Sequence, residues 1–90
     1  MQPTIGWIVH YTLGQQDADE INRRRTHRVT RTGNDAQGGD VCPAMIVRIF
    51  GDTPESAVNL QVFLDGADSY WATSRTLGQG PSHWAWPERV

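Results

Sequence analysis

Residues 58–66 have the sequence VNLQVFLDG, and this stretch decides the fold class. Aliphatic side chains occupy every second position from Val58 to Leu64. This two-residue period predicts a strand with one buried face. Asp65-Gly66 follows as a hairpin signal, and the next residue, Ala67, allows a turn of more than two residues.

Similar signals on both sides of this stretch predict four more strands. They cover Ala44–Phe50, Ser69–Arg75, His83–Trp86 and, near the start of the chain, Thr4–Thr12. Turn and loop residues separate the three that lie in the second half of the chain. We therefore expect a mainly β fold of about five strands, either a small SH3-like barrel or a curled antiparallel sheet. The barrel is favoured because closure removes free strand edges.

A short helix and a long loop are expected between the first two strands. Gln15–Arg25 carries acidic residues in its first turns and arginines in its last, an order that complements the helix dipole. Its apolar face is poor, so the helix needs support from the rest of the fold. From Thr26 to Asp40 there is no apolar period, and we expect a mobile loop that is either functional or simply disordered. Residues 1–90 are expected to form a single domain.

The length of the chain limits its core. A chain of 90 residues buries only roughly 60% of its unfolded surface. Domains this small usually need additional stabilisation by disulfides, a metal ion or a partner chain. Cys42 is the only cysteine, which excludes an internal disulfide, and the three scattered histidines argue against a structural zinc. Self-association is the remaining source of additional stability, so we expect a homo-oligomer.

The formal charge is −2, and all eight basic residues are arginines. Two explanations stay open: a genome that favours arginine codons, or recognition of carboxylates and phosphates by the planar guanidinium. An acidic pI of about 5.8 argues against binding to long nucleic acid. No apolar run is long enough to span a membrane and no secretion signal is evident, so we expect neither a membrane partner nor export from the cytoplasm.

Catalytic motifs are missing from the sequence. It contains no nucleophile elbow, no phosphate-binding glycine loop and no zinc-protease motif. Cys42 is expected to be a buried, inert thiol. His10 or His83 could pair with an aspartate as acid and base, but nothing in the spacing requires it. We therefore expect a protein that is not an enzyme and that has no cofactor.

Aromatic residues near the C-terminus are candidates for ligand binding. Trp71 and Trp84 are each either core residues or outward platforms on which a nucleobase stacks. Thr73 and Arg75 alternate with Trp71, so a regular strand would place all three on one face. An ordinary exposed strand face has the same pattern. His83, next to Trp84, completes this candidate set.

A cluster of basic residues ends the predicted helix. Arg23, Arg24 and Arg25 are followed by His27, Arg28 and Arg31. The cluster is either a solvated helix end or an arm that closes over a small anion. A local basic arm on an acidic protein favours a small anionic ligand over a long duplex.

Several runs of the sequence resemble a group of short proteins, mostly uncharacterised, that are encoded by tailed bacteriophages and prophages. The runs are IVHYTL at 8–13, INRRR at 21–25, PAMIVR at 43–48, NLQVFLDG at 59–66, WATS at 71–74 and GPSHWAWP at 80–87. The resemblance covers nearly the whole chain and is weakest over 26–40. It supplies no active site, so no residue role follows from it.

The resemblance implies a phage origin and a place in the cytoplasm of an infected bacterial host. Small accessory phage proteins include oligomeric sponges that sequester cyclic-nucleotide or ADP-ribose-type immune signals. A sponge needs arginines and aromatics but no catalytic group, so this is the function we expect. The alternative is a protein–protein interaction module that inhibits a host protein or serves as a minor virion or assembly factor.

Overall fold

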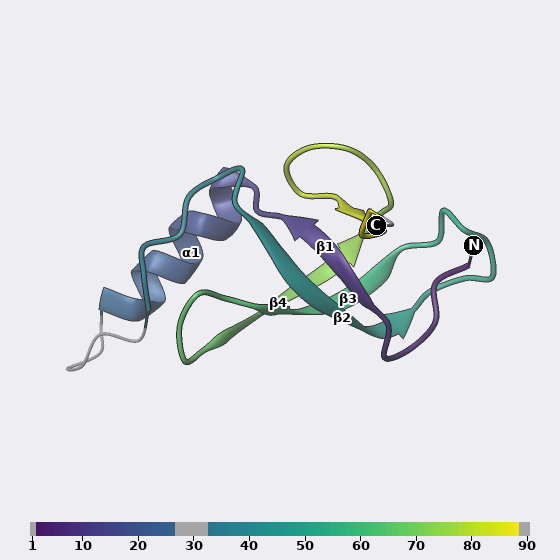
Figure 1. The fold of residues 1–90 in the computed structure, drawn as a ribbon, viewed down its shortest axis with the longest axis horizontal. Helices are drawn as coiled ribbons and strands as arrows, with labels where there is room; N and C mark the ends of the chain where they lie inside the picture. Colours follow the sequence, from purple (N-terminus) through teal and green to yellow (C-terminus); the bar gives the residue numbers. More distant parts are fainter. Residues whose placement is uncertain (1, 27–32, 89–90) are drawn as a thin grey trace.

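A computed structural model describes residues 2–26 and 33–88 of the chain (Figure 1). One sheet and one helix make up the fold. The elements are β1 (Ile8–Thr12), α1 (Gln15–Thr26), β2 (Val41–Ile49), β3 (Val58–Phe63), β4 (Ser69–Arg75) and β5 (Trp84–Ala85). All paired strands are antiparallel, and their order across the sheet is β4-β3-β2-β1-β5. The mainly β fold with one helix between β1 and β2 is as predicted.

The sheet is curled but not closed. β4 and β5 are its two edges, so the curled-sheet alternative is confirmed and the favoured SH3-like barrel is wrong. The physical reason lies in β5, which is only two residues long. A strand this short pairs with β1 through His10 and Tyr11, and on its other side makes only an isolated parallel bridge, from Trp84 to Leu77 in the segment after β4.

The inner face of the curled sheet holds the core. Val9 and Tyr11 of β1 alternate with exposed neighbours, and β2, β3 and β4 supply buried residues in the same way. Trp84 lies fully buried among them, together with Leu13 and Ile21 from the helical side. The period-two pattern at 58–64 was therefore a correct guide to which side chains are buried.

The observed ends of the strands differ from the predicted ends where local backbone geometry opposes the alternating sequence pattern. Thr4–Trp7 forms a turn, with the Trp7 amide donating to the Thr4 carbonyl at 3.2 Å, so β1 begins only at Ile8. β2 begins earlier than predicted, at Val41, and includes Pro43 opposite His10. β4 spans Ser69–Arg75 as predicted.

A bulge near the end of β4 changes the direction of its side chains. Leu60 pairs with Ala72, whereas Val58 pairs with Arg75, so β4 has one more residue than β3 in this interval. Ser74 has a φ of 55°, and its amide donates to the Asn59 side chain at 2.8 Å. Since Val58 and Leu60 are both inner-face residues, the bulge turns Arg75 toward the inner face.

The segment after α1 is tied back to the helix and to the β3–β4 turn. The side-chain amide of Asn22 donates to the Ala36 carbonyl at 2.8 Å and accepts from the Ala36 amide at 2.9 Å. Gly33 pairs with Gly66 as an isolated bridge. Residues 27–32, in the first half of the mobile loop predicted over 26–40, lie outside the described residues, and the mobility stays a prediction. No helix in the described ranges is long and apolar enough to cross a membrane.

Candidate functional site

The candidate site is a groove of about 480 Å³ between α1 and the edge strand β4, which we call the α1–β4 groove. The helix wall and the strand wall each contribute four residues. They are Gln16, Asp17, Glu20 and Arg23 from α1 and Tyr70, Trp71, Thr73 and Arg75 from β4. Four of these, Arg23, Trp71, Thr73 and Arg75, belong to the predicted ligand-binding set. The fold thus brings together residues that are far apart in the chain.

A buried carboxylate forms the floor of the groove. Asp17 is 2% exposed, and its oxygens accept from the Tyr11 hydroxyl at 2.5 Å and the Gly14 amide at 2.9 Å. The Arg75 guanidinium donates to the same carboxylate at 2.9 Å. Tyr70 places its hydroxyl 3.0 Å from Asp17 and 3.0 Å from Glu20, and its single proton serves one of them at a time. A buried charge needs this degree of partnering.

The two tyrosines of the network are held in their protonated form. Burial, followed by the hydrogen bond to Asp17, raises the pKa of Tyr11 well above its ordinary value. Tyr70 has a raised pKa for the same two reasons, with Glu20 adding to the effect. Both phenols therefore act as hydrogen-bond donors at neutral pH, and neither is poised to act as a base.

The guanidinium of Arg75 lies at the floor of the groove and not at its rim. The bulge at Ser74 directs its guanidinium to Asp17, and the group stands 5.8 Å from the centre of the Tyr11 ring. Its Nε is buried and has no hydrogen-bond partner in the described part of the chain. The prediction that Arg75 shares one face with Trp71 and Thr73 through simple alternation is therefore wrong, although all three border the groove.

The rim of the groove carries the groups that a ligand can reach. Trp71 is 58% exposed, as expected if Tyr70 is the inward member of that pair. Arg23 is exposed and makes no ion pair with any residue of the described ranges. Thr73 is also exposed. The rim therefore combines an indole face, a hydroxyl and one uncommitted guanidinium.

Arg24 and Arg25 are engaged with Asp68 and do not line the groove, although the Arg24 guanidinium stands 6.0 Å from the centre of the Tyr70 ring. Arg25 donates to both carboxylate oxygens of Asp68, at 2.7 and 3.0 Å, and Arg24 approaches the same carboxylate at 3.3 Å. Arg24 also donates to the Ser69 carbonyl at 2.8 Å. This pairing lowers the pKa of Asp68 and raises that of Arg25. The remaining basic residues of the predicted arm, His27, Arg28 and Arg31, lie outside the described residues.

Trp84 and His83 do not contribute to the groove. The exposed stacking role considered for Trp84 is wrong because its indole is fully buried and packs edge-on against Trp86, 5.2 Å between ring centres. His83 is half-buried, with its Nδ1 3.2 Å from the Thr76 carbonyl. Trp7 is 44% exposed and packs edge-on against Trp86.

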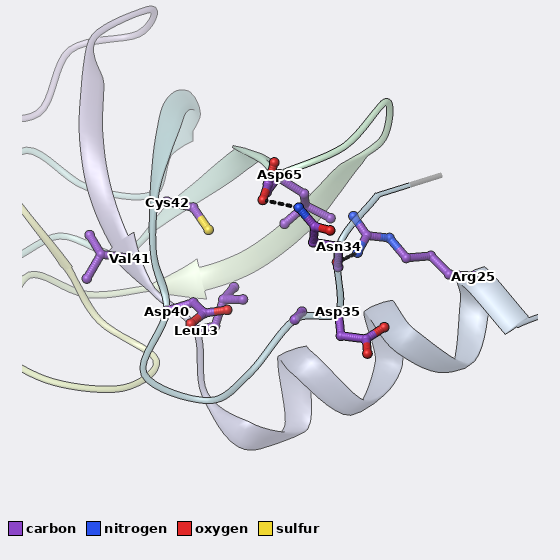
Figure 2. Close-up of a pocket in the computed structure, with 10 residues that line it drawn as sticks. Leu13, Arg25, Asn34, Asp35, Asp40, Val41, Cys42 and Asp65 are labelled. Atoms are coloured by element: carbon purple, nitrogen blue, oxygen red, sulfur yellow. Dashed lines mark hydrogen bonds between the residues drawn. The ribbon is translucent and has the colours of Figure 1, made fainter. Parts of the chain in front are cut away.

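A second cavity of about 270 Å³ lies between the end of α1, the segment that leads into β2 and the residues that follow β3 (Figure 2). Leu13, Ala36, Cys42 and Leu64 supply apolar lining, and three aspartates, Asp35, Asp40 and Asp65, line it with Arg25 and Asn34. Asn34 donates to Asp65 at 2.7 Å. Burial raises the pKa of the Cys42 thiol, which disfavours the thiolate form. The carboxylates make this cavity unsuitable for an anion, so the α1–β4 groove is the better match to the predicted ligand.

Sequence reasoning missed Asp17, Glu20 and Tyr70 as groove residues. Asp17 stood out only as a first-turn acid of the helix, a position that is normally solvated. Comparison with protein-family models, with curated proteins and with solved structures finds no match. In the described ranges no group of three or more His, Cys, Asp or Glu side chains could hold a metal ion.

Proposed function

We propose that this protein works by binding, and that its ligand is a small nucleotide-derived anion held in the α1–β4 groove. The observation that carries the proposal is the convergence of Arg23, Trp71 and Thr73 on one rim above a hydrogen-bonded floor. The volume of the groove, about 480 Å³, lies in the range of small-molecule sites. Each rim residue is of a type that recognises part of a nucleotide.

The roles follow from the chemistry of the rim. The exposed indole of Trp71 is a stacking surface for a base, and such stacking contributes about 1–3 kcal/mol per base. Arg23 can form charge-assisted hydrogen bonds with a phosphate. The Thr73 hydroxyl can donate to a phosphate or accept from a sugar hydroxyl.

Charge on the walls restricts the ligand further. Arg75 is paired with Asp17, and Glu20 adds a carboxylate to the helix wall. Arg23 is thus the one wall cation in the described structure that is not already paired. We infer a ligand that presents one phosphate, or one phosphodiester, near Arg23 and not a chain of phosphates. A cyclic dinucleotide or a cyclic ADP-ribose-type molecule has suitable groups.

The biological setting of the proposal comes from the resemblance to phage and prophage proteins. A phage protein that binds a nucleotide-derived immune signal in the host cytoplasm, without turning it over, would withhold it from the host defence. The groove supports the non-catalytic part of this proposal, because its tyrosines and Asp17 are all engaged with one another.

Calorimetry with a panel of cyclic di- and trinucleotides and cyclic ADP-ribose isomers tests the proposal. We expect one class to bind, and we expect Trp71→Ala and Arg23→Ala each to weaken binding by at least tenfold, about 1.4 kcal/mol. Trp7→Ala and Arg48→Ala are matched controls, because both residues are exposed and neither lines the groove.

The absence of binding to every compound by folded protein would overturn the proposal. Recovery of chemically altered ligand after denaturation of the protein would show an enzyme instead. Binding that survives both groove substitutions would place the ligand elsewhere.

A second candidate function is a protein–protein interaction module that inhibits a host factor or acts in the virion. The observation that favours it is the commitment of Arg24, Arg25 and Arg75 to aspartates, which leaves little positive charge for a phosphate ligand. A stoichiometric partner recovered from infected cells, or the protein's presence in purified virions, would support this function.

A further inference from the structure

The outer face of the sheet, opposite the core, is unusually apolar. We define it by the outward residues of β1 to β4, which are Ile8, His10, Thr12, Val41, Pro43, Met45, Val47, Arg48, Gln61, Phe63, Ser69, Trp71 and Thr73. Strand pairing places Ile8, Met45, Gln61 and Trp71 in one row across four strands. The face is therefore a continuous surface and not a scatter of single side chains.

Five large apolar side chains on this face remain substantially exposed. Trp71 is 58% exposed, Phe63 43% and Ile8 44%, and Val41 and Val47 are 60% and 38% exposed. Taking about 200 Å² for a fully exposed large side chain, they present about 500 Å² of apolar surface. This is near the upper end for the largest apolar patch of a monomer, about 300–600 Å², and such patches are often functional.

Arg48, which pairs with Asn59, is the one formally charged residue that the described outer face carries, although 20% of the chain is charged. Arg48 lies just beyond Val47, at the β2 bulge, and its guanidinium stands over the Phe50 ring at 5.2 Å. Apart from Arg48, an acidic or basic partner would find no complementary charge here. The remainder of the face can meet an identical face without repulsion between like charges, which an isologous two-fold contact requires.

We propose that the outer face is a dimer interface, and that its occupant is a second copy of this chain. The two sheets would pack face to face with their strands inclined at about 30°, as in β-sandwiches. With its polar members included, the face approaches the roughly 800 Å² per partner of a stable interface. The dimer gives a 90-residue chain with a thin core a second apolar layer.

This interface is independent of the proposed ligand, apart from Trp71 and Thr73, which border both surfaces. The test therefore uses Ile8 and Phe63, which do not line the α1–β4 groove. Sedimentation equilibrium over a wide concentration range is expected to show the wild-type mass rising from 10.1 kDa for one chain to that of two chains. Folded Ile8→Glu and Phe63→Glu variants are expected to keep the mass of one chain.

Ile5→Glu is the matched control, because Ile5 is 57% exposed but lies in the turn before β1. It should associate as the wild type does. Ile8→Thr, which keeps a β-branched side chain, covers the case in which a glutamate prevents folding, and it should weaken association about tenfold through lost apolar area. A wild type that keeps the mass of one chain throughout would overturn the proposal. So would association that persists in the folded Ile8 and Phe63 variants.

Discussion

The hydroxyl of Tyr70 lies 3.0 Å from a carboxylate oxygen of Asp17, although the two residues are 53 positions apart in the chain. This contact joins the edge strand β4 to the first turn of α1. Because Arg75 of the same strand binds the same carboxylate, Asp17 connects the helix to β4 at two points. The α1–β4 groove exists because this carboxylate holds its two walls together.

Removal of the Asp17 carboxylate should destabilise the fold strongly. Asp17→Ala leaves Arg75 and two tyrosine hydroxyls without their shared acceptor, and we expect a loss of about 3 kcal/mol in the free energy of unfolding. Urea denaturation followed by circular dichroism measures it. Asp19→Ala is the control on the same helix, because Asp19 is exposed and should change stability by less than about 0.5 kcal/mol. Equal losses for both variants would contradict a central role for Asp17.

Alkaline pH should unfold the protein as its tyrosines ionise. Tyr11 and Tyr70 are the only tyrosines, and the pKa of each is raised in the fold. A raised folded-state pKa means that this contribution to stability is complete below about pH 10, the unfolded pKa, and is lost as the pH rises above it. Phenolate absorbance should therefore appear only with unfolding above about pH 10. Phenolate forming in folded protein near that pH would refute the prediction.

Two tryptophans should respond to substitution in opposite ways. Trp84→Ala removes a fully buried indole and should cost about 3–5 kcal/mol of stability. Trp71→Ala removes an exposed one and should change stability by no more than about 0.5 kcal/mol while abolishing ligand stacking. Thermal unfolding of both variants, with ligand calorimetry on Trp71→Ala, checks the contrast. A strongly destabilised Trp71→Ala variant would assign that residue to the core.

Acid should weaken the contact between α1 and the β3–β4 turn. Arg25 lowers the pKa of Asp68, so the stabilisation is complete above about pH 5 and is lost as the pH falls through the folded-state pKa. We expect Asp68→Asn to remove about 1 kcal/mol at neutral pH and little at about pH 2. Urea denaturation at several pH values measures this difference. Asp52→Asn is the control, because Asp52 lies in the exposed turn after β2 and makes no ion pair with any described residue.

The strands and the helix could be predicted from sequence because their signals are local. The alternation at 58–64 and 69–75 and the charge order of 15–25 depend on neighbouring residues, and the structure confirms β3, β4 and α1 nearly as predicted. The ends of β1 and β5 were less accurate, since turns and loops at those places compete with strand pairing.

The arrangement of the candidate site was decided by tertiary structure. A one-residue bulge at Ser74 reverses the direction of the Arg75 side chain. Asp68 binds Arg24 and Arg25, which lie 44 and 43 positions away in the chain. Local sequence determines the period with which side chains alternate. Which buried carboxylate meets which guanidinium, and which tryptophan fills the core, depends on the curl of the sheet and on the short β5 that leaves it open. Those pairings form only when distant segments meet, because the cost of burying each charge is offset by a partner from another element.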